Sequence, residues 1–305
     1  MTAHAKELIS EIMDLKKQRK AVFLVHNYQR PEVQDLADFV GDSLELSRKA
    51  SRIEAEIIVF CGVHFMAETA FLVNPGKVVL LPEIESGCPM ADMITVEQLI
   101  KKKKEVPGAI VVCYVNSSAA VKAESDICCT SANAVRVVQS LPADREILFI
   151  PDQYLGEWVA RKTGRDMHLW PGYCPTHMRI TGKKILEEKS KHPGSIALVH
   201  PECRPDAKEA ADEVLSTGGM IRYAGESPAQ EFIIGTETGI LHRLRKENPE
   251  KKFIPVNSKA VCPNMKKITL EKVLLALQKM HYKITVPKSI RERALLAVDR
   301  MLTVG

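Results

Sequence analysis

The chain has 305 residues, 45% apolar and 27% charged, which is the composition of an ordinary globular protein and not of a disordered, collagen-like or coiled-coil chain. Its length predicts about two domains or one large one. The 43 basic residues exceed the 38 acidic ones by only five and aromatic residues make up 5%, so neither charge nor stacking surface favours a nucleic-acid partner.

Residues 1–20 are predicted to form a charged amphipathic helix, and they contain neither the apolar run nor the small-residue cleavage site expected of a leader peptide. The most apolar stretch, Ile57 to Val73, contains His64 and Glu68 and is therefore unsuited to crossing a bilayer. We expect a cytoplasmic protein with no membrane partner. Eight cysteines in that compartment are not expected to form disulfides, so each is either a small buried residue or a metal ligand.

Further along the chain, short apolar runs predict strands, and helices lie between them. The predicted strands are Ala21–Val25, Ile57–Phe60, Val78–Leu81, Ala109–Val115, Ile147–Ile150, Met167–Trp170, Ile196–Val199, Met220–Tyr223 and Phe253–Val256. The predicted helices include Asp35–Ser51, Pro205–Leu215, Thr269–Met280 and Ser289–Leu302. The runs are continuous and do not alternate with polar residues, which is typical of parallel sheets covered on both faces.

Three sets of landmarks recur at steps of 88 and 86 residues, or of 86 and 88. Polar residues that follow three of the predicted strands form one set: His26, Tyr114 and His200. A second set is Ser43, Ser131 and Thr217. A third is Cys88, Cys174 and Cys262, each followed by proline. Shared periods of this kind indicate an internal repeat.

The sequence therefore predicts an α/β fold of three homologous three-layer α/β/α repeats with parallel sheets around a pseudo-threefold axis. The predicted units are 1–88, 89–174 and 175–262, each with three strands, followed by a helical segment, 263–305, that packs back on the body. Function in parallel sheets gathers beyond the carboxyl ends of the strands. We therefore expect the site at the centre, where the three Cys-Pro loops converge.

The three Cys-Pro loops predict accessible thiols, and the chain contains no C-x-x-C pair, which disfavours a structural zinc site. Iron–sulfur clusters normally take four cysteines, so three ligands on a four-iron cluster would leave one iron open as a Lewis acid. Four of the remaining cysteines are predicted to be core residues, namely Cys61, Cys113, Cys128 and Cys129, the last two at a helix start. Cys203, which follows His200-Pro201-Glu202, is left without an assignment.

A set of motifs across the chain resembles the quinolinate synthase family. The motifs are His26-Asn27-Tyr28-Gln29, Gly41-Asp42-Ser43, Ser86-Gly87-Cys88-Pro89-Met90-Ala91-Asp92, Tyr114-Val115-Asn116, Cys129-Thr130-Ser131 with Asn133, Pro151-Asp152, Gly172-Tyr173-Cys174 with His177, His200-Pro201-Glu202-Cys203, Ser216-Thr217, Gly235-Thr236-Glu237 and Val261-Cys262-Pro263-Asn264-Met265. They run from Val25 to Met265 and together are highly specific.

The resemblance implies a transferase that condenses iminoaspartate with dihydroxyacetone phosphate to quinolinate, with loss of phosphate and water, in the biosynthesis of NAD. It implies one [4Fe–4S] cluster per chain, held by Cys88, Cys174 and Cys262, whose open iron assists the last dehydration. It also implies an L-aspartate oxidase or an aspartate dehydrogenase as supplier of the labile imine. Some family members carry a C-x-x-C near the C-terminus, and this chain has none, so redox control through such a pair is not expected.

The resemblance also assigns roles to the polar residues. Glu202 resembles the general base, with His200 beside it to bind or orient substrate, and Tyr28 with His26 resembles a proton relay. Substrate-orienting or substrate-binding residues are Tyr114, Asn116 and His177. The hydroxyls of Ser43, Ser131, Ser216 and Thr217 resemble a cradle for carboxylate and phosphate groups, and helix capping is the alternative for each.

Two other functions remain open on the sequence. One is a different [4Fe–4S]-dependent hydro-lyase on the same scaffold. The other is a non-catalytic iron–sulfur sensor, which the density of titratable residues at strand ends disfavours.

Overall fold

The computed structural model describes residues 3–304 and contains the same order of elements three times, as α-β-α-β-α-β-α-β followed by a short 3-10 turn. The first set is α1 Ala3–Gln18, β1 Ala21–His26, α2 Pro31–Gln34, β2 Phe39–Gly41, α3 Ser43–Ala50, β3 Ile57–Cys61, α4 His64–Leu72, β4 Val78–Leu80 and η1 Ala91–Met93. The second is α5 Val96–Glu105, β5 Ile110–Tyr114, α6 Ala119–Ala123, β6 Ile127–Cys129, α7 Ala134–Gln139, β7 Ile147–Ile150, α8 Gln153–Thr163, β8 His168–Leu169 and η2 His177–Arg179. The third is α9 Gly182–Lys191, β9 Ile196–Val199, α10 Pro205–Ala210, β10 Glu213–Val214, α11 Thr217–Glu226, β11 Glu231–Gly235, α12 Ile240–Glu247, β12 Lys252–Pro255 and η3 Met265–Lys267.

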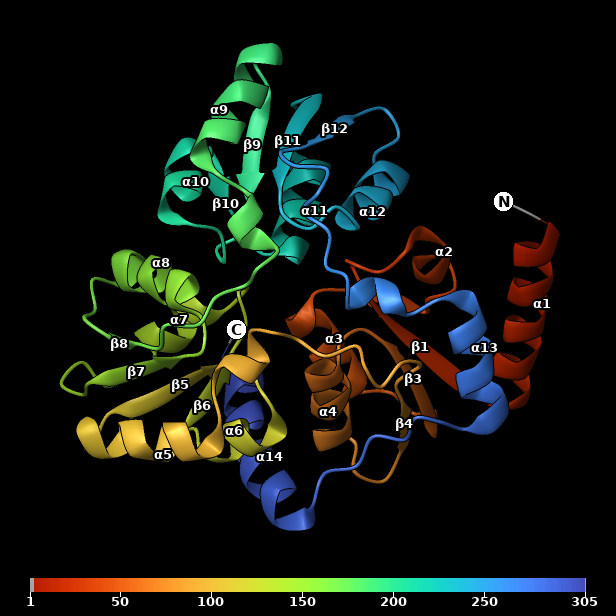
Figure 1. Cartoon of the computed structure of the whole chain (residues 1–305), viewed down its shortest axis with the longest axis horizontal. Coiled ribbons are helices and arrows are strands. Elements are labelled where there is room, and N and C mark those ends of the chain that lie inside the picture. Colours follow the sequence, from red (N-terminus) through yellow and green to blue (C-terminus); the bar gives the residue numbers. More distant parts are fainter. Residues whose placement is uncertain (1–2, 305) are drawn as a thin grey trace.

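Each set forms one parallel four-stranded sheet, and the three sheets have the same strand order. These orders are β2-β1-β3-β4, β6-β5-β7-β8 and β10-β9-β11-β12. We call the sheets with their helices units 1, 2 and 3. Helices lie on both sides of each sheet, and the units are arranged around a common centre (Figure 1). The predicted fold class is thus confirmed, while the unit boundaries at residues 88, 174 and 262 stay a prediction.

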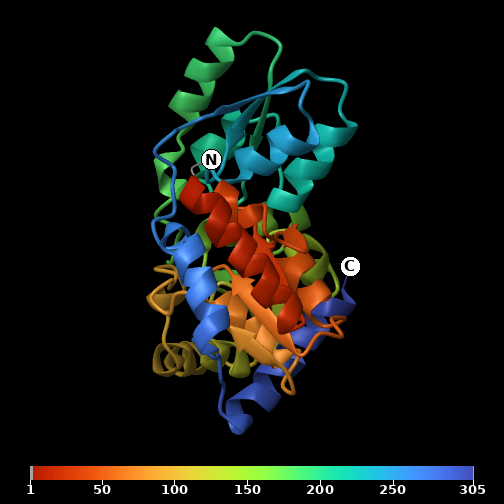
Figure 2. The same cartoon turned by 90° about the vertical axis from the view of Figure 1, so that its right-hand side faces the viewer.

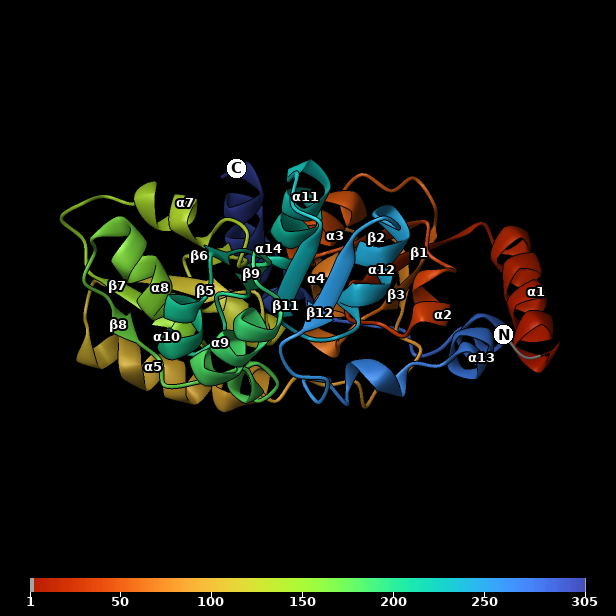
Figure 3. The ribbon, with the colours of Figure 1, turned by 90° about the horizontal axis from the view of Figure 1, so that it is seen from above.

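The molecule is flattened, and its helices divide between the two broad sides. Figure 3 shows α3, α7 and α11 toward one broad side and α5, α9 and α13 toward the other. The apolar runs found in the sequence form buried strands in each sheet. All four residues of β7, for example, are buried. Parallel strands have coincident carboxyl ends, so each sheet presents one edge at which its loops meet.

The chain after the third unit forms two helices that return to units 1 and 2. They are α13 Leu270–Lys279, which packs against α1, and α14 Lys288–Thr303, which packs against α6 and β6. Figure 2 shows α1 and α13 side by side. Between these helices the chain bonds along β4, where the Leu81 N–H donates to the Tyr282 carbonyl at 2.9 Å and the Ile284 N–H to that of Val79 at 2.9 Å. This contact covers an edge of the first sheet.

The sequence prediction of three strands per unit is wrong, because each unit has a fourth, short strand. The missed strands β2, β6 and β10 have three, three and two residues. β2 lies inside the predicted helix Asp35–Ser51, and β10 lies inside the predicted helix Pro205–Leu215. Cys128 and Cys129 are part of β6 and not of a helix start. Strands this short carry too few residues for a period to be recognised in the sequence.

The predicted strand Met220–Tyr223 is also wrong, because these residues belong to helix α11. The Ser216 side chain caps this helix by accepting the Gly219 N–H at 3.1 Å. Met220 and Ile221 are buried on one face of the helix, and the strand of this region is β11. A short apolar run does not distinguish a strand from a buried helix face.

Two recurrent local contacts fix the same backbone path in each unit. Asp38, Asp126 and Asp212, at steps of 88 and 86 residues, each accept the N–H of a residue near the start of the central strand. The Oδ2 distances to the nitrogens of Phe23, Val111 and Ala197 are 2.7, 2.8 and 2.7 Å. After each Cys-Pro loop, the threonine of an Ile-Thr pair caps a ten-residue helix; these are Thr95, Thr181 and Thr269.

We predict that Asp212→Ala lowers the free energy of unfolding by about 1 to 2 kcal/mol, because the Ala197 N–H loses a charged acceptor. The midpoint of thermal unfolding should fall by a few degrees. Asp166→Ala, at an exposed aspartate of the same protein, is the matched control. Equal midpoints for the two variants would contradict the stabilising role of the repeated aspartate.

Candidate active site

The central strands of the three units end at one cavity of about 180 Å³. In each unit the residue at the strand end and the residue two positions later both line it. These six residues are His26 and Tyr28, Tyr114 and Asn116, and His200 and Glu202. The sequence period therefore places chemically different side chains at equivalent backbone positions around one space.

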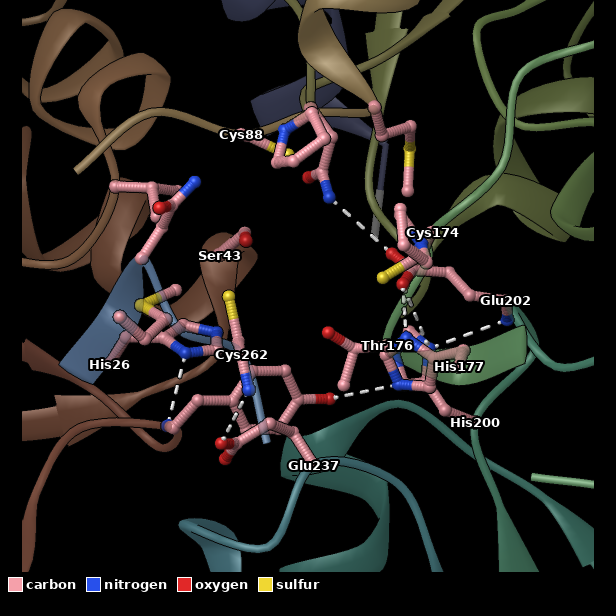
Figure 4. Close-up of a pocket in the computed structure, with 18 of the residues that line it drawn as sticks. His26, Ser43, Cys88, Cys174, Thr176, His177, His200, Glu202, Glu237 and Cys262 are labelled. Atoms are coloured by element: carbon pink, nitrogen blue, oxygen red, sulfur yellow. Dashed lines mark hydrogen bonds and ion pairs between the residues drawn. The ribbon is translucent and has the colours of Figure 1, made fainter. Parts of the chain in front are cut away.

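The three Cys-Pro loops also reach this cavity. Cys88, Cys174 and Cys262 all line it and are half-buried, more enclosed than the accessible thiols that the sequence predicts. Figure 4 shows the three side chains around the same space. The loop that carries Cys174 passes close to Pro151, and only a glycine fits at position 172. A Cβ atom there would lie 2.3 Å from the carbonyl oxygen of Pro151.

Each of the three sulfur atoms accepts hydrogen bonds from the backbone that follows it. The donors are the N–H groups of Met90 and Ala91 for Cys88, of His177 for Cys174, and of Asn264 and Met265 for Cys262. The 3-10 turns η1, η2 and η3 begin three residues after each cysteine and supply this geometry. Such bonds stabilise a sulfur that carries negative charge, as a metal-bound thiolate does.

Burial has the opposite effect on these thiols. It raises the pKa of Cys88 to about 12, with the charges of Cys262 and Glu202 adding to the rise. It also raises the pKa of Cys174 and of Cys262. Three neighbouring thiolates would thus be unfavourable without a cation, and a metal centre supplies one. The donor set therefore fits a metal group bound by these cysteines.

The other five cysteines do not line the cavity, so no fourth cysteine among residues 3–304 can join the set. Cys61, Cys113, Cys128, Cys129 and Cys203 are all buried. Cys113 and Cys128 lie opposite each other on β5 and β6. Cys203 packs in the apolar cluster of unit 3 and not against the cavity.

Glu202 is a buried carboxylate that polar groups from two units surround. The Tyr114 hydroxyl donates to its Oε1, Asn116 Nδ2 donates to the same atom at 3.4 Å, and His177 Nδ1 lies 2.7 Å from Oε2. Burial alone would raise the pKa of Glu202. The electrostatic interactions with the rings of His177 and His200 and the hydrogen bonds from His177 and Tyr114 outweigh burial and lower this pKa to about 2. Glu202 is therefore ionised and accepts hydrogen bonds.

His26 and His200 adopt the same local arrangement in units 1 and 3. The Nδ1 atom of each accepts the backbone N–H two residues later, from Tyr28 at 3.1 Å and from Glu202 at 3.3 Å. In a neutral ring this places the proton on Nε2, which for His200 lies 3.1 Å from the Ser131 hydroxyl oxygen. Burial lowers the pKa of both histidines to about 3, so both rings are neutral donors.

A second polar chain joins Tyr28 to His177. The Tyr28 hydroxyl lies 2.5 Å from the Thr236 hydroxyl, which lies 2.8 Å from His177 Nε2. His177 in turn approaches Glu202, so the chain connects unit 1 to the buried carboxylate. Burial and the charge of Glu202 raise the pKa of Tyr28, so its phenol stays protonated.

Three of the four predicted hydroxyl residues line the cavity, namely Ser43, Ser131 and Thr217. Ser43 and Thr217 are the first residues of α3 and α11. Ser216 does not line the cavity. Its hydroxyl donates to Asp42 Oδ2 at 3.1 Å and caps α11, as the capping alternative predicts.

Several residues that line the cavity had no role predicted from the sequence. Glu237 follows β11 and is fully buried, with its Oε1 atom 3.0 Å from Lys266 Nζ and 3.1 Å from the Cys262 nitrogen. Its position after a buried strand is the signal that could have identified it. Other unassigned lining residues are Phe65, Met66, Met90, Thr176, Arg179 and Asn264, whose contribution depends on loop packing.

A second set of three possible metal ligands also lies in the cavity. Ligand atoms of Cys174, His177 and Glu202 lie within 4.8 Å of one another and could hold a single metal ion. This set shares only Cys174 with the three-cysteine set. A metal group in the cavity is thus consistent with two different arrangements of protein ligands.

The fold and this cavity define an α/β enzyme with a metal-binding site enclosed by three repeated units. A family model described as Quinolinate synthetase A protein matches residues 10–303. The chain belongs to this family. The expected family and the expectation of an enzyme are confirmed, and a non-catalytic sensor is excluded.

Curated relatives agree with the family. The chain is 59% identical over 238 residues to the quinolinate synthase of Desulforudis audaxviator, with 78% of each chain covered. It is 58% identical over 240 residues to that of Dehalococcoides mccartyi strain CBDB1, covering 78% of this chain and 79% of the relative. It is 58% identical over 238 residues to that of Methanosarcina barkeri, covering 78% of each. Among the described residues, no helix combines the length and apolar character that crossing a membrane requires.

We predict that Tyr114→Phe lowers the free energy of unfolding at pH 7 by about 2 kcal/mol, because the ionised Glu202 loses a donor. The pKa of Glu202 is lowered from 4.5 to about 2 in the folded state. Stabilisation by its contacts is therefore complete above pH 4.5 and is lost as the pH falls toward 2. Urea unfolding of both proteins between pH 7 and 2 should show their difference shrinking below about pH 4.5. Tyr282→Phe, at a 41% exposed tyrosine, is the control, and a difference independent of pH would contradict the assignment.

Proposed function

We propose that this protein condenses iminoaspartate with dihydroxyacetone phosphate to form quinolinate, releasing phosphate and water, as a step of NAD biosynthesis. The observation that carries the proposal is the cavity itself. Three cysteines and the six strand-end residues of three units line one enclosed space, in a chain whose relatives are named quinolinate synthases. An enzyme that oxidises aspartate would supply the imine.

We assign Cys88, Cys174 and Cys262 as ligands of one [4Fe–4S] cluster. The backbone donors to each sulfur support this set, and His177 and Glu202 are already engaged with Thr236 and Tyr114. Because no fourth cysteine of the described chain lines the cavity, one iron is left without a thiolate. When bound, the cluster supplies a Lewis acid for the loss of a hydroxyl group.

Glu202 is the general base of the proposed reaction. Enolisation and dehydration both require removal of a proton from carbon, and Glu202 is an ionised acceptor on the cavity wall. His177 and Tyr114 hold its two oxygen atoms in place. The chain from Glu202 through His177 and Thr236 to Tyr28 can move a proton to or from the substrate. His26 lies against the Tyr28 ring and faces the same cavity.

The other lining residues bind and orient two anionic substrates. His26 and His200 are neutral, so they donate hydrogen bonds from Nε2 and bring no positive charge into the site. Ser43 and Thr217 offer hydroxyls at the N-termini of α3 and α11, where the helix dipole favours an anion. Asn116 and Ser131 complete the polar wall. Ser216 acts through its cap on α11, which places Thr217.

The proposal predicts quinolinate formation under strict anaerobiosis by cluster-loaded protein given fresh iminoaspartate and dihydroxyacetone phosphate. Cys88→Ala should lose a cluster ligand and at least 100-fold in rate, whereas Cys61→Ala should retain the cluster because Cys61 lies outside the cavity. Iron and sulfide analysis should give about four of each per chain. Iron without sulfide would favour a single ion at Cys174, His177 and Glu202. A full cluster without product would favour a different hydro-lyase.

A second prediction separates catalysis from cluster binding. Glu202→Gln preserves size and polarity but cannot take up a proton, so turnover should fall by about 10² to 10⁴. Cluster content, read from iron, sulfide and the visible spectrum, should remain that of the unmodified protein. Loss of the cluster in this variant would indicate that Glu202 is a ligand and not the base.

A further inference from the structure

Lys208 is a buried lysine beside the site that the proposed mechanism does not use. It lies on α10 in unit 3 and is 5% exposed. A lysine is rarely buried unless its ammonium group has partners. Its partners therefore indicate why the fold retains a cation here.

The ammonium group of Lys208 joins two backbone segments from different units. Its Nζ atom donates to the carbonyl oxygen of Pro201 at 3.3 Å and to that of Tyr154 at 2.5 Å. Pro201 lies between His200 and Glu202, while Tyr154 lies in the first turn of α8 in unit 2. Figures 1 and 3 both show α10 next to α8.

The turn that Lys208 contacts carries His200 and Glu202, two of the six strand-end residues. The peptide that joins Pro201 to Glu202 is held at both ends, because its N–H donates to His200 Nδ1 at 3.3 Å and its carbonyl oxygen accepts from Lys208. Glu202 must meet Tyr114 and Asn116, which belong to unit 2. By bonding to both this turn and α8 of unit 2, Lys208 sets the distance between Glu202 and its partners Tyr114 and Asn116.

Neighbouring groups offset only part of the cost of burying the Lys208 ammonium group. Asp152, the fully buried cap of α8, has a buried Oδ2 atom with no hydrogen-bond partner. Burial lowers the pKa of Lys208 to about 8, although interactions with Asp152, Glu157 and Cys203 oppose this shift, and Arg161 lowers the pKa further. Burial also raises the pKa of the Asp152 carboxyl and of the Cys203 thiol. The ammonium group therefore loses its proton within an accessible pH range.

We propose that Lys208 is a positioning residue for Glu202, tying the turn of His200, Pro201 and Glu202 in unit 3 to the first turn of α8 in unit 2. This inference rests on the proposed role of Glu202. Lys208 lines no part of the cavity and acts only through the backbone that it holds. Loss of its charge loosens the turn and displaces the carboxylate from its donors.

The test compares Lys208→Met with Lys208→Arg. Methionine has an unbranched side chain of similar length but no charge, whereas arginine keeps a positive charge that does not titrate. The control is Lys183→Met, at a lysine whose side chain is 87% exposed. Each variant is measured as cluster-loaded enzyme for kcat and KM between pH 6.5 and 9.5, and by hydrogen exchange.

Lys208→Met should lower kcat by about tenfold to a hundredfold with little change in KM, because a displaced catalytic group slows the chemical step. In the unmodified enzyme kcat should fall above about pH 8, as Lys208 loses its proton. This alkaline fall should vanish in Lys208→Met and move at least one pH unit upward in Lys208→Arg. A merely structural lysine would lower the yield of folded protein without moving the pH profile.

Hydrogen exchange makes the test independent of the proposed reaction. The amides of Glu202, Cys203 and Leu155 should exchange faster in Lys208→Met than in Lys183→Met. If they do not, or if kcat and its pH profile are unchanged, the positioning role is overturned. If the unmodified loaded protein makes no quinolinate, the proposed function fails, while exchange still decides whether Lys208 holds the turn. Should Lys208→Met not fold, an alkaline fall that stays at the same pH in Lys208→Arg overturns the inference.

Discussion

The structure depends on keeping the carboxylate of Glu202 ionised while it is buried. A charge of this kind is tolerated in a protein interior only when donors surround it. Tyr114 and Asn116 come from the unit opposite Glu202, and His177 comes from the loop that also carries Cys174. The buried charge therefore links the relative placement of two units to the chemistry of the cavity. Any displacement between these units would leave the carboxylate without its donors, at a cost of several kcal/mol.

In each unit, the residues that build the scaffold are repeated, whereas the residues that line the cavity differ. Positions that build the scaffold are the same three times, such as the cysteines, the capping threonines and the aspartates that hold the central strands. Positions at the ends of those strands differ, with histidine or tyrosine first and tyrosine, asparagine or glutamate two residues later. A symmetric frame thus surrounds a cavity whose walls are chemically unequal. The two substrates and the metal group of the proposed reaction require such inequality.

Much of the fold could be predicted because long apolar runs and a repeat of nearly constant length are local signals. The central strands and the last two helices were found within one or two residues. The short edge strands were missed because two or three residues show no period, and Met220–Tyr223 was misassigned because its apolar residues pack on one face of a helix. In the site, Glu237 and Thr236 followed a strand that the prediction had displaced, so their position at a strand end was not recognised. Lys208 gave no signal, since nothing local marks a lysine that will be buried.

The sequence by itself determined the three-unit architecture, the three cysteine loops and the set of polar residues at strand ends. It did so because strand burial, turns and caps depend on residues near one another in the chain. Only the tertiary structure decided that the Ser216 hydroxyl donates to Asp42, that Thr236 joins Tyr28 to His177, and that the charge of Glu202 is balanced by groups from a second unit. These contacts join residues dozens to hundreds of positions apart. Their distances and burial arise only when the three units close on one another, and these quantities set the protonation state of each group.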